Sequence, residues 1–235
     1  GGLAGIVPAA AFKATHTEMA TGGQAAAVED LRARARALGV VLEPAPATQL
    51  LRLLEELEQW NRAYNLTAIT TREAMVTGHL LDSLAGSSAL SGTCIADLGT
   101  GAGFPGLPLA IAHSERQFTL IDSTAKKVRF VAHAARTLGL QNVDAVHARA
   151  EELRPEKPFD TVLARAVAPL AELATLARPL AGPGTLLLAY KGQPPDAELA
   201  ALPADWQLLG VRTVQVPGLA AARCLVSLKF SPGAQ

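Results

Sequence analysis

The sequence predicts an α/β protein: a doubly wound, mostly parallel sheet of seven strands, preceded by a helical appendage. Three observations predict it. From Thr93 onward, short apolar runs alternate with helix-like segments, which is typical of parallel βαβ units. A glycine-rich turn follows the first of these runs. The last two runs are separated only by a Pro217-Gly218 turn, which indicates an antiparallel hairpin at the end of the sheet.

Length and composition limit the classes of protein that fit. The chain has 235 residues, of which 49% are hydrophobic, and its formal net charge is zero. This length suffices for one α/β domain with an appendage. No apolar run approaches the ~20 residues of a transmembrane helix, so no membrane partner is expected. A neutral chain lacks the strongly basic character typical of non-specific nucleic-acid binding, so local clusters must provide any RNA contact.

The first 18 residues and the two cysteines lead to separate expectations. Residues 1–18 have no clear period, and Met19 resembles a natural start, so we expect a non-native remnant or a disordered leader there. The segment lacks the basic start and apolar core of a signal peptide, which predicts a cytoplasmic protein. Cys94 and Cys224 lie in apolar runs without metal-ligand spacing. They are expected to be buried thiols, and no metal site is predicted.

Residues 19–92 are predicted to form an N-terminal helical region. Gln24–Leu38 is rich in Ala and Arg and ends at Gly39. A second helix, capped by Thr48, has one apolar face made by Leu50, Leu53, Leu54, Leu57, Trp60 and Tyr64. A third helical region, Arg72–Leu90, is expected to be loosened at Gly78 and Gly86.

Residues 93–235 are predicted to form the α/β domain. The expected strands are Cys94–Leu98, Gln117–Ile121, Val143–His147, Phe159–Ala164, Thr185–Tyr190, Gln207–Val216 and Arg223–Phe230. The expected helices are Pro105–Ala112, Ala125–Leu138, Ala150–Leu153, Leu170–Leu180 and Pro194–Ala201. Seven strands with a terminal hairpin are typical of the methyltransferase variant of the doubly wound fold.

The turn after the first strand predicts a cofactor site. It places Asp97 before three alternate glycines, Gly99, Gly101 and Gly103, where the backbone can turn sharply and approach a ligand. The following helix offers free N–H groups to an anion, yet the loop has no cation for a phosphate. S-adenosylmethionine fits, because it has no phosphate and its ammonium suits an acid such as Asp97. Residues 101–106 also match the dinucleotide pattern, which leaves NAD as an alternative.

Further candidates follow the ends of later strands, where ligands of open parallel sheets bind. Asp122 could accept both ribose hydroxyls or cap the helix that follows it. Ala150 and Glu151 could surround an adenine, or Glu151 could be a first-turn acid. Arg165 could hold a substrate phosphate, stack on a base or brace the cofactor loop, and Lys191 has the same kind of position; either could also be a surface cation.

Two further groups could contact RNA. Lys126, Arg129, His133 and Arg136 form one helical stripe, which could contact phosphates or be a solvated face. In the segment Trp60–Thr67, amides lie beside aromatic rings that could stack on an exposed base, although a packed helix end is the alternative. From these segments and His79–Ser83, the candidates for RNA contact are Asn61, Tyr64, Asn65, His79, Lys126, Arg129 and Arg136.

Six motifs occur along the chain in a characteristic order. They are Trp60-Asn61-x-x-Tyr64-Asn65-Leu66-Thr67, His79-x-x-Asp82-Ser83, the loop from Asp97 to Gly106 with Phe104 in it, Leu120-Ile121-Asp122-Ser123, Arg165-Ala166 and Tyr190-Lys191-Gly192. Together they resemble the bacterial small-subunit ribosomal RNA guanine-N7 methyltransferases, also called the glucose-inhibited division protein B family. The resemblance covers roughly Leu50 to Phe230.

The resemblance implies a class I S-adenosylmethionine-dependent methyltransferase that modifies N7 of a guanine in a conserved loop of 16S ribosomal RNA near the decoding region. It implies cofactor contacts from Gly99, Phe104, Asp122, Ala150-Glu151 and Arg165, and S-adenosylhomocysteine as product. We expect a monomer whose substrate is 16S ribosomal RNA, free or in a small-subunit particle. Arg165 and Lys191 are expected to position the reactants without acting as a base. A small-molecule methyltransferase and a non-catalytic nucleotide- or RNA-binding module are the alternatives.

Overall fold

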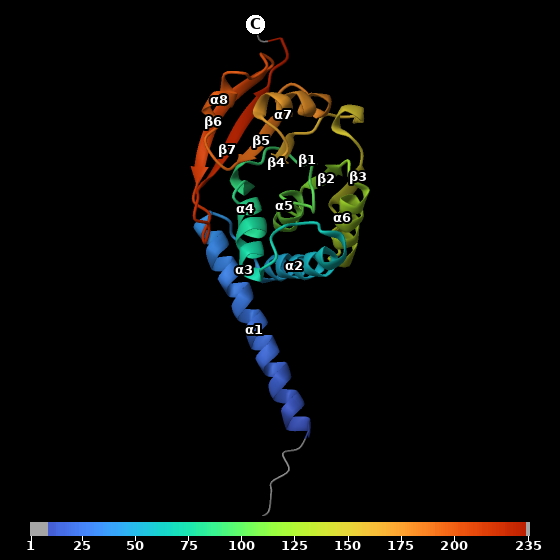
Figure 1. The fold of residues 1–235 in the computed structure, drawn as a ribbon, viewed down its shortest axis with the longest axis vertical. Coiled ribbons are helices and arrows are strands. Elements are labelled where there is room, and N and C mark those ends of the chain that lie inside the picture. The colour runs from blue at the N-terminus through green and yellow to red at the C-terminus, as the bar shows by residue number, and fades with distance from the viewer. Residues whose placement is uncertain (1–8, 234–235) are drawn as a thin grey trace, which may run out of the picture.

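A seven-stranded sheet forms the centre of the structure, a computed structural model that describes residues 9–233, with side chains from residue 22 onward (Figure 1). The strands are β1 (Cys94–Leu98), β2 (Gln117–Asp122), β3 (Val143–His147), β4 (Thr161–Arg165), β5 (Leu186–Lys191), β6 (Trp206–Val214) and β7 (Arg223–Phe230). Their order is β3-β2-β1-β4-β5-β7-β6. The first five strands pair in parallel, whereas β7 is antiparallel to β5 and β6. The predicted fold class, strand number and terminal hairpin are confirmed.

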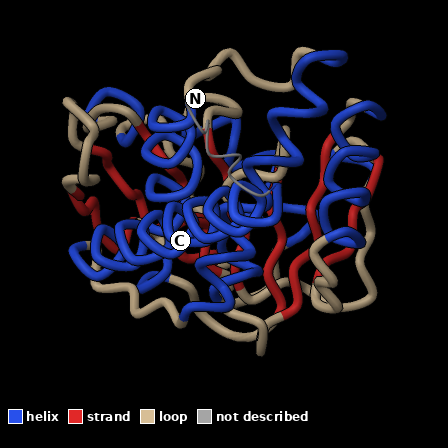
Figure 2. Tube along the Cα trace, turned by 90° about the horizontal axis from the view of Figure 1, so that it is seen from below, coloured by secondary structure: helices blue, strands red, loops and turns tan. Residues whose placement is uncertain are grey.

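Alternate residues of the strands feed two apolar cores, one on each face of the sheet. Ile95 and Leu163 belong to the core that includes α2 (Pro44–Tyr64), α5 (Gly106–Ala112) and α6 (Ala125–Thr137). Residues of the opposite parity belong to the core under α7 (Leu170–Ala177), α8 (Asp196–Leu199), η3 (Ala150–Glu152) and η4 (Arg178–Leu180). Figure 2 shows helices packed around the strands. Because both faces are covered, only the strand ends remain for a ligand.

The N-terminal region is helical, as predicted. It comprises α1 (Ala9–Ala37), α2, α3 (Arg72–Met75), the π-helix η1 (Val76–Leu81), α4 (Asp82–Leu84) and the 3-10 turn η2 (Ser87–Ala89). Helix α1 begins inside the segment expected to be a leader; residues 1–8 lie outside the described residues, and the leader stays a prediction. No helix among residues 9–233 is long and apolar enough to cross a membrane.

Four local expectations are wrong, for identifiable reasons. Helix α2 starts at Pro44, whose fixed φ suits a first turn, and Thr48 lies inside the helix with its hydroxyl donating to the Pro44 carbonyl. The helix expected over 170–180 ends at Ala177 and continues as a 3-10 turn, because Pro179 has no N–H to donate. The short helix expected over 150–153 is also a 3-10 turn. Cys94 is exposed because it opens its strand, while Cys224 is buried as expected.

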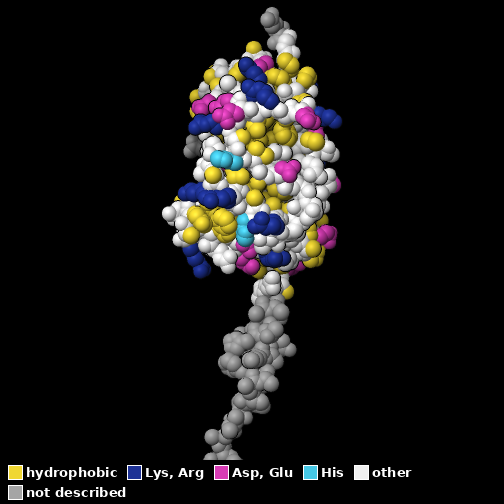
Figure 3. Space-filling model, turned by 90° about the vertical axis from the view of Figure 1, so that its right-hand side faces the viewer, with side chains coloured by type: hydrophobic (Ala, Val, Ile, Leu, Met, Phe, Trp, Pro, Cys, Tyr) yellow, Lys and Arg dark blue, Asp and Glu magenta, His cyan; other side chains and the backbone are white. Residues whose placement is uncertain are grey.

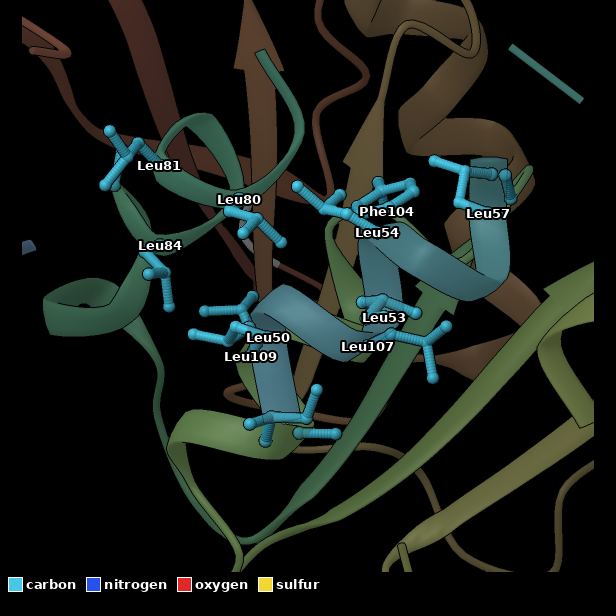
Figure 4. Close-up of a cluster of buried hydrophobic side chains, with 14 of the residues drawn as sticks. Leu50, Leu53, Leu54, Leu57, Leu80, Leu81, Leu84, Phe104, Leu107 and Leu109 are labelled. Atoms are coloured by element: carbon cyan, nitrogen blue, oxygen red, sulfur yellow. The ribbon is translucent and has the colours of Figure 1, made fainter. Parts of the chain in front are cut away.

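Helix α2 shares its core with the sheet. Leu50, Leu53, Leu54 and Leu57 are all fully buried, as their helical spacing predicts. Figure 4 shows them beside Leu107 and Leu109 of α5 and beside Phe104 of the glycine loop. The helical appendage therefore packs against the glycine loop in a shared core and is not a separate folding unit.

Replacing Leu50 by Ala tests this shared core. We expect a loss of about 2–5 kcal/mol in the free energy of unfolding, because the cavity lies in a closely packed interior. Urea unfolding should still show one transition, seen alike by far-UV circular dichroism and tryptophan fluorescence. Val41→Ala is the control, since Val41 is 73% exposed and its truncation should cost less than about 0.5 kcal/mol. Two separate transitions would contradict a shared core.

Candidate functional site

A buried carboxylate shapes the glycine loop after β1. Oδ2 of Asp97 accepts a hydrogen bond from the Thr100 hydroxyl at 2.6 Å and from the Gly106 amide at 2.8 Å. These bonds connect the end of β1 to the start of α5 across the loop. Asp97 is fully buried, and burial raises its pKa from 3.8 to about 6. The structure thus gives Asp97 the task of holding the loop, and a bond to a cofactor ammonium stays a prediction.

The three glycines of the loop have the left-handed backbone that their residue type favours. Gly99, Gly101 and Gly103 have φ values of +66°, +61° and +88°. A Cβ on Gly101 would meet nothing within 4 Å, so the space above this glycine is open. A Cβ on Gly99 would lie 2.9 Å from a methyl group of Val167. The loop therefore leaves room for a ligand directly above Gly101.

Asp122, at the end of β2, faces this loop. One carboxylate oxygen accepts from the Gly101 amide at 2.9 Å and the other from the Thr124 amide at 2.8 Å. Asp122 thus orders the turn before α6, and each of its carboxylate oxygens keeps a further lone pair. Contact with a ribose stays a prediction, which this position supports.

Two cavities lie at the carboxyl edge of the sheet. The first, which we name the loop cavity, has a volume of about 180 Å³ and is lined by Leu98, Gly99, Ile121, Asp122, Ser123, Ala148, Arg149, Ala150, Glu151, Val167 and Leu176. It brings Gly99, Asp122 and Ala150-Glu151 together, as the sequence predicts. Apolar side chains and a carboxylate in one slot suit an adenosine, whose base is flat and whose ribose carries two hydroxyl donors.

The second cavity, which we name the arginine cavity, has a volume of about 350 Å³. It is lined by Ile69, Gly78, His79, Asp82, Arg165, Ala166, Tyr190, Lys191, Gly192 and Arg223. The two cavities diverge after β4, where Ala166 has φ +55°. This conformation is costly for a residue with a Cβ. It places Arg165 in one cavity lining and Val167 in the other.

One carboxylate holds both arginines of the second cavity. Oδ2 of Asp82 accepts from Nη1 of Arg165 at 3.0 Å, and Oδ1 accepts from Nε of Arg223 at 2.8 Å. Arg165 also donates to the Gly78 carbonyl at 3.0 Å. Asp82 is only 4% exposed, so these bonds are well shielded from water. These bonds tie Arg165 to the helical region, and its contact with a cofactor or a substrate stays a prediction.

An aromatic stack joins the arginine cavity to the glycine loop. The rings of His79 and Phe104 are nearly parallel, with centroids 4.4 Å apart, and the Arg165 guanidinium lies 5.6 Å from the Phe104 centroid. Burial and the charge of Arg165 lower the pKa of His79 to about 4, so its ring is neutral at physiological pH. Its Nε2 forms a hydrogen bond with the Thr67 hydroxyl at 2.9 Å. His79 is thus a buried packing residue, and its RNA contact stays a prediction.

The amide candidates at the end of α2 have structural tasks as well. The Asn61 side chain donates to the Thr67 carbonyl at 3.0 Å and accepts from the Thr67 amide at 2.9 Å, which fixes the chain after the helix. Asn65 ends the helix in a left-handed conformation with φ +48°. Tyr64 packs against Trp60 and is 43% exposed. Tyr64 and Asn65 are both exposed, whereas Asn61 is half-buried.

The basic stripe on α6 is divided. Lys126 donates to the Tyr64 carbonyl at 3.0 Å, and His133 pairs with Glu56 at 2.7 Å. Arg129 and Arg136 are exposed and bond to no residue that the structure describes. On the face that includes α6, Lys and Arg side chains alternate with acidic ones (Figure 3). The face is therefore a mixed surface with local basic points.

Lys191 lies at the rim of the arginine cavity. Its ammonium donates to the Ala168 carbonyl at 3.1 Å and to the Glu198 carboxylate at 2.7 Å. The hydrogen bond from Lys191 lowers the pKa of Glu198. This pairing fixes the segment between β4 and α7 and leaves Lys191 close to the cavity.

Sequence analysis does not predict a role for two residues of this site, Asp82 and Arg223. Asp82 lies in one of the six motifs but was given no role, and Arg223 was not a candidate. Arg223 could have been found from topology, because an antiparallel strand begins where its parallel neighbours end. The register bears this out: Cys224 pairs with Lys191 at the end of β5.

A larger cavity of about 510 Å³ lies elsewhere, between η2 and strands β5, β6 and β7. Its lining includes Leu209 and Val211, which are exposed, and contains no acid. Across the described residues, no group of three or more His, Cys, Asp or Glu side chains could hold a metal ion. The clustered functional groups therefore point to the two smaller cavities.

The raised pKa of Asp97 predicts a dependence of stability on pH. Because the folded pKa exceeds the unfolded one, the protonated carboxyl favours the fold at low pH, and this contribution is lost as pH rises from about 4 through 6. Asp97→Asn, which cannot ionise, should therefore gain stability relative to the wild type by up to about 3 kcal/mol between pH 4 and 7.5. Urea unfolding across this range measures the difference.

His79 provides a control of opposite sign. Its folded pKa lies below the unfolded value of 6.5, so its contribution is present above pH 6.5 and is lost as pH falls towards 4. His79→Gln should therefore lose its disadvantage relative to the wild type as the medium becomes acidic. A pH-independent difference for both variants would show that neither group is buried as the structure has it.

Comparison with known proteins identifies the family. Residues 47–226 match the family described as GidB, rRNA small subunit methyltransferase G. The protein of that name from Nitrosococcus oceani is 46% identical over 192 residues, 82% of this chain and 90% of the relative. The one from Methylococcus capsulatus is 51% identical over 181 residues, 77% and 88% of the two chains.

Solved structures agree on the fold. A SAM-dependent methyltransferase from Aquifex aeolicus has a TM-score of 0.50 at 20% identity and covers 67% of this chain and 93% of its own. The [4+2]-cyclase SpnF has a TM-score of 0.53 at 17% identity and covers 79% and 94%. Since a cyclase has this architecture too, the fold alone does not define an activity, and the sequence relatives carry the assignment. This chain belongs to the rRNA small subunit methyltransferase G family.

Proposed function

We propose that the protein transfers the methyl group of S-adenosylmethionine to N7 of a guanine in 16S ribosomal RNA. Family membership supports small-subunit ribosomal RNA as the substrate class. The structural observation that carries the proposal is the pair of adjoining cavities at the carboxyl edge, one suited to adenosine and one lined by arginines. Family membership also removes a small-molecule methyltransferase and a non-catalytic module as alternatives.

The loop cavity fits the cofactor. Asp122 would hold the ribose hydroxyls, Gly99 and Gly101 would let the ligand approach the backbone, and Ala150-Glu151 would lie around the adenine. Phe104 would support the cofactor through the loop that it anchors in the core. When bound, S-adenosylmethionine supplies a methyl group activated by a sulfonium.

The arginine cavity is where the guanine would enter. Guanine N7 carries an in-plane lone pair, so no enzymic base is needed, and the cavity offers none that is ready to act. His79 is a weak base because of its lowered pKa, and both oxygens of Asp82 are bonded to arginines. Arg165 and Lys191 would act by position, since small displacements of reactants can cost ~100-fold in rate.

The remaining expectations belong to the same proposal. We infer a monomer, a target presented as RNA or within a small-subunit particle, and a cytoplasmic location. RNA would approach over Tyr64 and α6, because α6 begins two residues after Ser123 of the loop cavity, contacts Tyr64 through Lys126, and exposes Arg129 and Arg136. Asn61, Asn65 and Lys126 would shape this surface through the bonds described above.

Mapping the methylated base tests the proposed function. The wild type with small-subunit RNA and methyl-labelled S-adenosylmethionine should form N7-methylguanine, identified by mass spectrometry. At saturating cofactor, the single-turnover rate should be nearly flat from about pH 6.5 to 8, because no base titrates. An inflection near pH 6 is expected in cofactor affinity, where Asp97 ionises. A methyl group on ribose or an exocyclic amine would refute the N7 assignment, and a steep rise with one deprotonation would reveal a base.

A pair of glycine variants tests the cofactor loop. Gly101 and Gly139 both have positive φ, +61° and +70°, and open space where a Cβ would lie. Alanine at either site should cost about 1 kcal/mol of stability through backbone strain. Only Gly101→Ala should weaken S-adenosylhomocysteine binding in calorimetry, by about tenfold or more, which corresponds to ~1.4 kcal/mol. Equal affinity of the two variants would mean that the ligand does not pass over Gly101.

Charge neutralisation tests the RNA surface. Changing Lys126, Arg129 and Arg136 to Gln should weaken RNA binding and reduce the slope of log affinity against log salt by about 1 to 3, because fewer counterions are released. Cofactor affinity should not change. The control neutralises Arg36, Lys157 and Lys229, which are exposed cations outside the lining of either cavity. If both triple variants have the same slope, the stripe is a solvated helix face.

A further inference from the structure

In the arginine cavity, the carboxylate oxygens of Asp82 already accept hydrogen bonds from other residues of the protein. Each carboxylate oxygen of Asp82 accepts from a different arginine, at 3.0 Å from Arg165 and 2.8 Å from Arg223. The nearby Gly78 carbonyl is also taken by Arg165. Because Asp82 is 4% exposed, little of its surface remains for a ligand.

The other polar side chains of the lining are committed as well. Lys191 donates to the Ala168 carbonyl and to Glu198. The Tyr190 hydroxyl donates to the Ser83 carbonyl at 2.8 Å, and Tyr190 is only 4% exposed. These bonds fix the walls of the cavity without adding an open acceptor side chain.

The side-chain groups that remain are donors. Arg223 is bound through Nε alone, so neither of its Nη atoms bonds to a residue among those the structure describes. Arg165 uses only Nη1. A guanidinium stays protonated and has no acceptor. The one other unpaired side-chain atom of the described lining, Nδ1 of His79, is buried.

This donor-rich lining matches one purine edge. Guanine presents two acceptors, N7 and O6, on the edge that is methylated, whereas adenine presents N7 and an amino donor. N7 must keep its lone pair free for the methyl group, so O6 is the group that the protein can read. We propose that Arg223 donates a hydrogen bond from Nη to O6 of the target guanine and thereby selects guanine over adenine; this rests on the proposed function.

Arg223 suits this task better than Arg165. The Arg165 guanidinium is held by two acceptors through one nitrogen and lies over the Phe104 ring of the cofactor loop. Arg223 comes from the first residue of β7, on the far side of Asp82, and its side chain is 27% exposed. Asp82 fixes its Nε and so restricts where the two Nη atoms can point. Asp82 is thus a positioning residue for Arg223.

Purine analogues separate reading of O6 from contact with a phosphate. 16S ribosomal RNA is assembled by splinted ligation with guanine, inosine or 2-aminopurine at the methylated position and rebuilt into small-subunit particles. Inosine keeps N7 and O6, whereas 2-aminopurine keeps N7 and lacks O6. Affinity is measured with S-adenosylhomocysteine bound, and single-turnover rates are measured separately. Arg223→Met removes the donors, and Lys229→Met removes an equal charge farther along β7.

The wild type should bind guanine and inosine alike and 2-aminopurine about 10- to 100-fold more weakly, as for loss of one charge-assisted hydrogen bond. Arg223→Met should bring all three RNAs to the level of 2-aminopurine, with S-adenosylhomocysteine affinity unchanged. Lys229→Met should keep the wild-type ratio. If Arg223→Met does not fold, Arg223→Lys is the deciding variant. A decrease of at least about threefold in the ratio of guanine affinity to 2-aminopurine affinity supports the inference, and an unchanged ratio overturns it.

Two further results would overturn the inference and leave the proposed function standing. One is a wild type that does not distinguish 2-aminopurine from guanine. The other is an Arg223→Met variant that weakens all three RNAs equally, which would mean a phosphate contact, since phosphates position the RNA and base edges specify it. Failure of the wild type to form N7-methylguanine on unmodified RNA would instead overturn the proposed function, and the inference with it.

Discussion

The bond between Asp82 and two arginines is the interaction on which the site depends. Asp82 belongs to the helical region, Arg165 to β4 and Arg223 to β7, so one carboxylate joins three parts of the fold that are far apart in sequence. Burying such a charge is expensive unless it is paired and fully bonded. Both carboxylate oxygens of Asp82 accept hydrogen bonds from arginines. The unbonded nitrogens of these two arginines are donors, so the cavity lining is rich in hydrogen-bond donors.

Residues of the arginine cavity pack directly against the glycine loop. Arg165 bonds to Asp82 in the arginine cavity, and its guanidinium also lies over the Phe104 ring of the glycine loop. His79, from the lining of the arginine cavity, stacks on the same Phe104 ring. The strained backbone at Ala166 sends consecutive side chains to different cavities. Such strain persists only where the surrounding structure enforces it. A change in the glycine loop should therefore alter the arginine cavity.

The sequence predicts the sheet well because its evidence is local. The bounds of β1, β3 and β7 agree with the structure, and the spacing of the α2 leucines correctly predicts a buried face. The loop candidates Gly99, Asp122 and Ala150-Glu151 do meet in one cavity, since parallel strands end at one edge. These features follow from residue order and from the geometry of neighbouring strands.

What the sequence could not predict depends on contacts between distant segments. Asn61 and His79 are candidates for RNA contact by their motifs, yet Thr67 bonds to both and holds them in the protein. Arg223 lacks a local motif and becomes part of the site only through the register of β7 on β5. The cap expected at Thr48 failed because Pro44 starts the helix one turn earlier. In each case a tertiary partner or a stronger local preference decides.

The most direct test of this account is a double-mutant cycle on Asp82 and Arg223. The free energy of unfolding is measured for the wild type, Asp82→Ala, Arg223→Met and the double variant. Removing Asp82 alone leaves two guanidinium groups without their shared acceptor, so the coupling between the two changes should reach about 1–3 kcal/mol. Additivity within about 0.5 kcal/mol would show that the two side chains act independently and would contradict the claim that Asp82 builds the cavity.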